Sequence, residues 1–87
     1  MPYLVVVYDV QADRTQLFLK YLRRYLTHVQ HSVFEGELTE GQTEEVTTKL
    51  ESMLEDDESV IVYRMSSDRF VDRSVFGEDP MDDQQFL

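Results

Sequence analysis

The chain has 87 residues, which is enough for one domain with a modest hydrophobic core. It contains no cysteine, which excludes a disulfide framework, a thiolate nucleophile and a zinc–thiolate site, and suits a cytoplasmic protein. Eighteen acidic against eight basic residues give a formal net charge of −10, which taken alone argues against a nucleic-acid partner. The longest apolar run is too short to span a bilayer and no basic segment precedes it, so we expect a soluble protein with no signal peptide and no membrane partner.

The charge balance also suggests a saline environment. Six of the eight basic residues are arginine, and an acidic, lysine-poor surface of the halophilic type is typical of proteins from very salty cytoplasm. At such salt concentrations the long-range repulsion between this chain and a polyanion is almost fully screened. This hypothesis predicts a higher melting temperature in molar KCl than in dilute buffer.

The first predicted element is a strand over residues 3–9, which is apolar on both of its faces. A strand of this kind is expected at the centre of a sheet that is covered above and below. Asp9 ends the strand at the rim of the sheet, where a ligand can reach its carboxylate.

A helix is predicted from Arg14 to Leu26, with Asp13 as its N-cap. Its apolar residues recur at helical spacing and form the stripe expected to face the core, with Leu17 on its flank: Phe18, Tyr21, Leu22, Tyr25 and Leu26. The basic residues fall largely off that stripe, where a solvated role is their simplest interpretation: Arg14, Lys20, Arg23 and Arg24.

The segment 28–38 is predicted to be extended, with a kink or bulge near His31 and Ser32 that can divide it into two strands. Gly36 predicts a second irregularity. Thr39 followed by Gln42 fits a capping box, so a second helix opens there. Its expected buried stripe is Val46, Leu50, Met53 and Leu54.

The last third of the chain alternates loops and strands. Residues 55–59 form an acidic break, for which a solvated loop is the simplest interpretation, and residues 59–65 form a second strand that is apolar on both faces. After a turn at 66–69, residues 70–77 are predicted to form a short edge strand. The domain therefore covers residues 1–77, followed by an acidic tail at 78–87 that we expect to be mobile when alone.

This order of elements predicts an α+β fold, a ferredoxin-like βαββαβ sandwich with an extra C-terminal edge strand and with the first and fourth strands adjacent at its centre. Two helices can cover only one face of the sheet, so we predict a homodimer whose sheets face each other about a two-fold axis. That axis would bring two copies of Asp9 to one cleft, where their carboxylates could share Mg²⁺. The alternative is that Asp9 merely caps the strand end or the helix start.

Three segments resemble a known family: Tyr8-Asp9 at the end of the first strand, residues 29–38 before the second helix, and residues 62–64 in the later strand. They are similar to the small second CRISPR-associated protein of spacer adaptation. The resemblance implies a ferredoxin-like homodimer, described both as a metal-dependent endoribonuclease or deoxyribonuclease and as the scaffold between two integrase dimers. It also implies that Asp9 is the metal ligand.

The resemblance extends to residues that would contact nucleic acid. The family has a basic pair early in its first helix, where this chain has Arg14 followed by Thr15 and Gln16. An arginine often stands in the family where this chain has His28, and the aromatic residue of the Ser-Val-Phe element is kept as Phe34. These departures reduce the number of charges available to stabilise a pentavalent phosphate.

Two functions follow from these residues. In the first, Mg²⁺ on the paired Asp9 carboxylates supports phosphodiester hydrolysis, while Arg14 or His28 steadies the developing charge. In the second, the dimer is a non-catalytic scaffold that bridges integrase subunits and lays Arg14, Arg23 and Arg24 along the RNA or DNA backbone. In that case the tail, with Phe86 and Leu87, could add a strand to the partner. A third possibility, a regulatory ligand-binding module, needs a glycine-rich loop that the sequence lacks.

Overall fold

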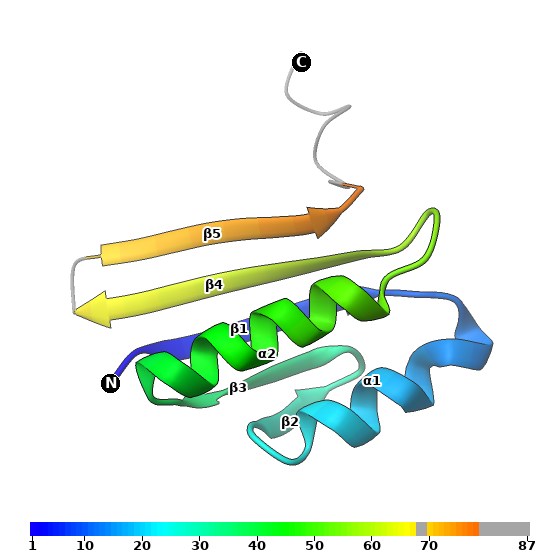
Figure 1. Cartoon of the computed structure of the whole chain (residues 1–87). Helices are drawn as coiled ribbons and strands as arrows, with labels where there is room; N and C mark the ends of the chain where they lie inside the picture. The colour runs from blue at the N-terminus through cyan, green and yellow to red at the C-terminus, as the bar shows by residue number, and fades with distance from the viewer. Residues whose placement is uncertain (68–69, 79–87) are drawn as a thin grey trace.

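The computed structural model describes residues 1–67 and 70–78, and the side chains of 1–65 and 72–78. Its elements follow the predicted order (Figure 1). The strands are β1 (Tyr3–Asp9), β2 (Thr27–Gln30), β3 (Val33–Glu37), β4 (Ser59–Ser67) and β5 (Phe70–Gly77). The helices are the 3₁₀ turn η1 (Ala12–Arg14), α1 (Thr15–Leu22) and α2 (Glu40–Met53). The tail from residue 79, with the predictions made for it, lies outside the described residues.

The strands form one antiparallel sheet in the order β2-β3-β1-β4-β5. The two strands predicted to be central, β1 and β4, are therefore adjacent in the middle, and β5 lies at an edge. Within the β1–β4 pair Asp9 is opposite Ser59, so the carboxyl end of β1 meets the start of β4. The predicted ferredoxin-like α+β fold is confirmed.

Both helices lie on the same face of the sheet, as Figure 1 shows. The core between the helices and the sheet is built from aliphatic and aromatic side chains. The ring of Tyr8 lies 5.5 Å from that of Phe18 and 6.1 Å from that of Phe34, both stacked. The core residues are Leu4, Val6, Tyr8, Phe18, Leu22, Leu26, Phe34, Leu38, Val46, Leu50, Val60 and Val62.

The opposite face of the sheet has no helix over it in the part of the chain that the structure describes (Figure 1). Residues directly opposite in the ladders share a face, so Val7 of β1 groups with Val33 and Ile61 on its two neighbours. Tyr3, on the same face, is 36% exposed. Charge is also present there, because Glu35 pairs with Val5. This surface is called the open face below.

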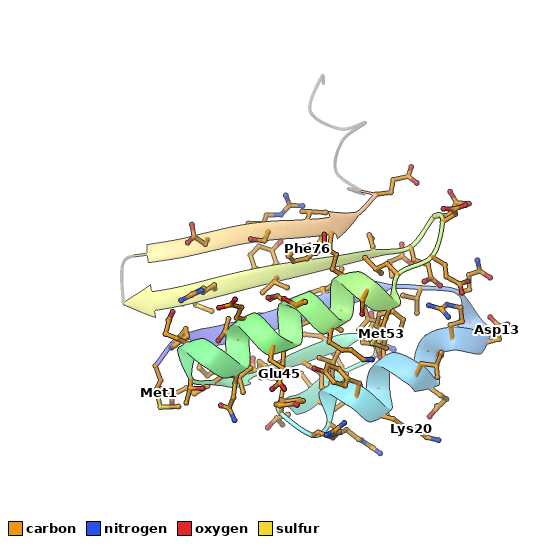
Figure 2. All side chains as sticks on the ribbon, in the orientation of Figure 1. Met1, Asp13, Lys20, Glu45, Met53 and Phe76 are labelled. Atoms are coloured by element: carbon orange, nitrogen blue, oxygen red, sulfur yellow. The ribbon has the colours of Figure 1, made fainter. Side chains whose placement is uncertain are left out.

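The predicted start of the first helix is wrong. Asp13 lies inside the 3₁₀ turn and is exposed (Figure 2), whereas Arg14 occupies the N-cap position of α1 without a side-chain cap. An N-cap needs extended backbone, which here occurs at Gln11, with φ −62° and ψ 146°. The helix also ends earlier than predicted, at Leu22, and tight turns lead to Leu26, whose N–H donates to the Leu22 carbonyl at 2.8 Å.

The extended segment divides at His31 and Ser32, as predicted, and the bulge lies between His28 and Gln30. His31 has a left-handed backbone, with φ 43°. Gly36 pairs in regular register with Leu4, so no bulge occurs there, but its backbone is irregular as predicted, with φ 158°. Space also favours glycine at this position, because a Cβ would lie 3.2 Å from Cδ2 of the core residue Leu26.

The second helix opens with the predicted capping box. The Gln42 N–H donates to the Thr39 hydroxyl and the Thr39 N–H donates to the Gln42 side chain, each at 3.0 Å. Val46 and Leu50 are buried as predicted, together with Thr43, while Met53 and Leu54 are half-buried. The capping box thus fixes where α2 begins after the strands.

Candidate functional site

Asp9 lies exposed at the end of β1, beside the start of β4 and the end of β5. A cavity of about 220 Å³ at this corner of the sheet is lined by Asp9, Asp57, Ser59 and Glu78. These side chains offer carboxylate and hydroxyl oxygens, which are the hard donors that Mg²⁺ or Mn²⁺ prefers. The donor chemistry therefore fits the metal implied by the resemblance.

One copy of the chain supplies an incomplete set of ligands. Among residues 1–67 and 70–78, no three His, Cys, Asp or Glu residues are close enough to hold a metal ion together. Asp9 could be one ligand, and further protein ligands would have to come from movement at the corner or from a second copy of the chain.

The corner depends on a close backbone contact between the end of β5 and the turn before β4. The N–H of Glu78 donates to the Glu58 carbonyl at 3.3 Å. Gly77 has φ 88°, and a Cβ there would lie 2.1 Å from that same carbonyl oxygen. Asp57, on the other side of the contact, also has a left-handed backbone, with φ 69°. Only glycine satisfies both the conformation and the approach at residue 77.

A buried ion pair lies under this corner. Glu58 has a fully buried side chain, and its Oε2 accepts from Arg14 Nε at 2.8 Å while its Oε1 accepts from Arg14 Nη2 at 3.0 Å. Backbone N–H groups of Gln11 and Glu55 also donate to the carboxylate, at 3.2 and 2.9 Å. Arg14 further donates to the Met53 carbonyl. The pair thus joins the loop after β1 to the end of α2 and the turn before β4.

The contacts around Glu58 change its protonation. The hydrogen bonds from Arg14 lower the pKa of Glu58 to about 2, against the opposing effect of burial, and the two backbone donors assist. The same hydrogen bond raises the pKa of Arg14. Both groups are therefore charged at neutral pH. Each oxygen of the buried carboxylate accepts two hydrogen bonds, which replace those that water would donate.

Sequence reasoning missed this pair. Glu58 was predicted to lie in a solvated loop and Arg14 on a solvated helix face, yet Arg14 is only 17% exposed. No periodicity could reveal the contact, because the partners are 44 residues apart and Glu58 follows three other acidic residues that are exposed. The ion pair also removes Arg14 from the set of freely available cations.

The other predicted nucleic-acid contacts lie in different environments. Arg23 and Arg24 are exposed in the turn after α1, and the Arg24 guanidinium lies 5.7 Å from the Tyr25 ring. Phe34 is fully buried in the core. His28 is half-buried, stacks on Phe34 at 4.6 Å and donates from Nε2 to the His31 carbonyl at 2.6 Å, which supports the β2–β3 turn. Of the five predicted contacts, Arg23 and Arg24 are the exposed ones.

None of the helices in the described ranges is long and apolar enough to cross a membrane.

Residues 1–73 match the family model described as CRISPR associated protein Cas2. A Haloferax volcanii protein named CRISPR-associated endoribonuclease Cas2 is 45% identical over 74 residues, covering 85% of this chain and 86% of its own length. A Methanothermobacter thermautotrophicus protein of the same name is 43% identical over 83 residues, covering 92% and 91%. A crystal structure of cas2 is similar with a TM-score of 0.73 and 39% identity, covering 91% of this chain and 90% of that one.

Proposed function

Because the chain belongs to the CRISPR-associated Cas2 family, we propose that it is a CRISPR adaptation protein that forms a homodimer and cleaves phosphodiester bonds of RNA or DNA with Mg²⁺ bound at Asp9. The observation that carries the proposal is the position of Asp9, exposed at the end of the central strand in a cavity lined by other oxygen donors.

The open face supports the homodimer. At the middle of the sheet it carries Val5, Val7 and Tyr63, which are half-buried, and Ile61, which is 9% exposed, and no helix lies over them in the described ranges. Monomers rarely expose a large apolar patch to water. A second copy placed face to face about a two-fold axis would bury both patches at once.

The dimer would also complete the metal site. Asp9 follows Val7 on the same side of β1, so an axis that passes near the end of the open face brings two Asp9 carboxylates toward each other. Mg²⁺, when bound, would polarise the scissile phosphate and lower the pKa of a bound water. Asp9 would hold the ion, Arg23 and Arg24 would attract the phosphate backbone, and Glu58 keeps the loop after Asp9 in place through Arg14.

The test is Mg²⁺-dependent cleavage of RNA and DNA by the wild type and by Asp9→Asn. Removing a direct metal ligand should reduce cleavage more than about 100-fold, since losing an outer-shell partner alone costs 10–100-fold. Asp56→Asn is the matched control, because Asp56 is exposed in the adjacent turn but does not line the cavity. Equal cleavage by wild type and Asp9→Asn, or no cleavage by wild type in any salt, would reject the nuclease role.

A purely structural role in the integration complex is the alternative. It is favoured by the small number of ligands that one chain offers near Asp9 and by the engagement of Arg14 with Glu58. In this case the dimer positions the nucleic acid between integrase subunits. Integration by the partner integrase would then survive Asp9→Asn, whereas the enzymatic proposal requires cleavage to fail in that variant.

A further inference from the structure

A basic groove lies between α1 and the C-terminal half of α2. Its volume is about 480 Å³, and its cations are Arg14, Lys20, Arg24 and Lys49. These are half of the lysines and arginines in a chain whose formal charge is −10. The groove is therefore a concentrated positive site on an otherwise acidic protein, and its ligand should be anionic.

Among the residues that the structure describes, three of these four cations have no carboxylate partner. Arg14 is neutralised by Glu58 and Glu55. Within the described part of the chain, no carboxylate pairs with Lys20 or Lys49, and Arg24 lies over the rings of Tyr21 and Tyr25 at 5.9 and 5.7 Å.

The groove also has an apolar lining, made by Leu17 and Tyr21 from α1 and by Met53 from α2. Leu17 is 52% exposed, although the sequence placed it at the edge of the core stripe. A sugar–phosphate backbone would gain little from covering Leu17 and Met53, whereas an apolar side chain would remove them from water. The mixed lining thus favours an acidic peptide over nucleic acid.

We propose that this groove binds the acidic segment 79–87 of the same chain. That segment carries Asp79, Asp82 and Asp83, together with Met81, Phe86 and Leu87. Its three aspartates equal in number the cations Lys20, Arg24 and Lys49, which have no carboxylate partner in the described ranges, and its apolar side chains match the lining of the groove. The segment itself lies outside the described residues, so the proposal rests on the groove, the charges and the path between them.

The path is short. The N–H of Glu78 bonds to the Glu58 carbonyl, the Glu58 carboxylate bonds to Arg14, and Arg14 lines one end of the groove. Nine extended residues span about 30 Å. The groove from Arg14 to Arg24 is roughly 15 Å long at the helical rise of 1.5 Å per residue. Segment 79–87 can therefore reach its far end, and the tether gives an effective concentration on the order of millimolar.

A docked segment 79–87 would reduce binding of nucleic acid, and this effect alone rests on the proposed function. Arg24 both lines the groove and belongs to the proposed phosphate contacts. A docked acidic segment would cover it, so the segment would compete with RNA or DNA. Removing the segment should then tighten binding to a duplex at low salt.

The docking itself is tested without nucleic acid or metal, so its failure leaves the nuclease proposal unaffected. The chain has no cysteine, so Gln85→Cys allows a single nitroxide label on the full-length protein. In ¹⁵N-labelled protein we expect the paramagnetic nitroxide to weaken the amide signals of Lys20, Arg24 and Lys49, compared with the same sample after the nitroxide is reduced. We also expect recovery in 1 M KCl, where the Debye length is about 3 Å. An equal loss of signal at the groove residues and at Val29, on strand β2, would overturn the proposal.

Charge-reversed variants separate docking from random contact. Lys20→Glu with Lys49→Glu should lower the docked population by roughly tenfold, and Asp82→Lys with Asp83→Lys in the same chain should restore it. Arg64→Glu is the control, since Arg64 pairs with Glu40 away from the groove. Failure of the reversed segment to restore the signal loss would count against the proposal.

Mixed samples identify the source of the segment. Nitroxide on an unlabelled chain should leave the ¹⁵N signals of a second chain unchanged, because the segment docks on its own chain. Signal loss at the groove in the mixed sample would place the segment on a second copy and reject the proposal. In a separate titration with duplex DNA, groove signals that shift identically with and without residues 79–87 would reject the competition between the segment and nucleic acid.

Discussion

Arg14 Nε donates to Glu58 Oε2 at 2.8 Å, across 44 residues of sequence, and the carboxylate has no exposed surface. Breaking a buried ion pair leaves one charge unpaired in a region that excludes water, which is far more costly than losing an exposed pair. The pair also holds the loop that follows Asp9 against the turn that precedes β4. It therefore connects the stability of the fold to the position of the candidate metal ligand.

The first prediction concerns this pair. Glu58→Gln should lower Tm by on the order of 10 °C, because Arg14 loses its buried counter-charge. Thermal unfolding followed by circular dichroism measures the change. Asp56→Asn, in the exposed part of the same turn, should leave Tm almost unchanged.

The same pair predicts a pH dependence. Hydrogen bonds from Arg14 lower the pKa of Glu58 from 4.5 to about 2, so the folded protein binds fewer protons than the unfolded chain in this range. The stabilisation is complete above about pH 5 and is lost as the pH falls toward 2. Wild type should lose its stability advantage over Glu58→Gln in that interval. An advantage that is constant from pH 6 to pH 2.5 would contradict this assignment.

The second prediction tests the backbone contact beside Asp9. Gly77→Ala should destabilise the chain by at least about 1–2 kcal/mol, since an L-residue is strained at φ 88° and the new Cβ meets the Glu58 carbonyl. Gly41→Ala is the matched control, because no atom lies within 4 Å of the added Cβ in α2. That substitution should be neutral or stabilising by up to about 1 kcal/mol. Urea unfolding compares the two, and equal effects would argue against strain at residue 77.

The third prediction concerns the open face. Val7→Glu should convert the proposed dimer to a monomer, because it places a charge opposite Val33 and Ile61 at the centre of the surface. Sedimentation velocity measures the mass of the species in solution. Val29→Glu introduces the same side chain at an exposed position and should leave the dimer intact. A wild type that sediments as a monomer would remove the proposed interface.

The fourth prediction concerns nucleic-acid contacts. Arg23→Glu with Arg24→Glu should weaken duplex binding independently of sequence and reduce the slope of log K against log salt by about 2, one for each phosphate contact. Arg64→Glu serves as the control for a change in overall charge. Binding that is unchanged in the double variant would exclude the turn after α1 from the interface.

Short-range patterns in the sequence were sufficient to predict most of the fold. Apolar runs with two apolar faces identified β1 and β4 and placed both at the centre of the sheet, and Thr39 with Gln42 identified the start of α2. The position of Asp9 at the strand end followed from the same pattern. These features were predictable because each depends on residues that are neighbours in sequence or on the two-residue period of a strand.

The sequence by itself determined the strand and helix order, the accessible carboxylate at Asp9 and the shortage of helix to cover both faces of the sheet. The tertiary structure alone decided that Arg14 and Glu58 form a buried pair, that Phe34 belongs to the core and that half of the cations line one groove. The physical reason is distance along the chain. Periodicity reports which side of its own element a residue occupies, whereas burial and pairing of a charge depend on which distant element packs against it.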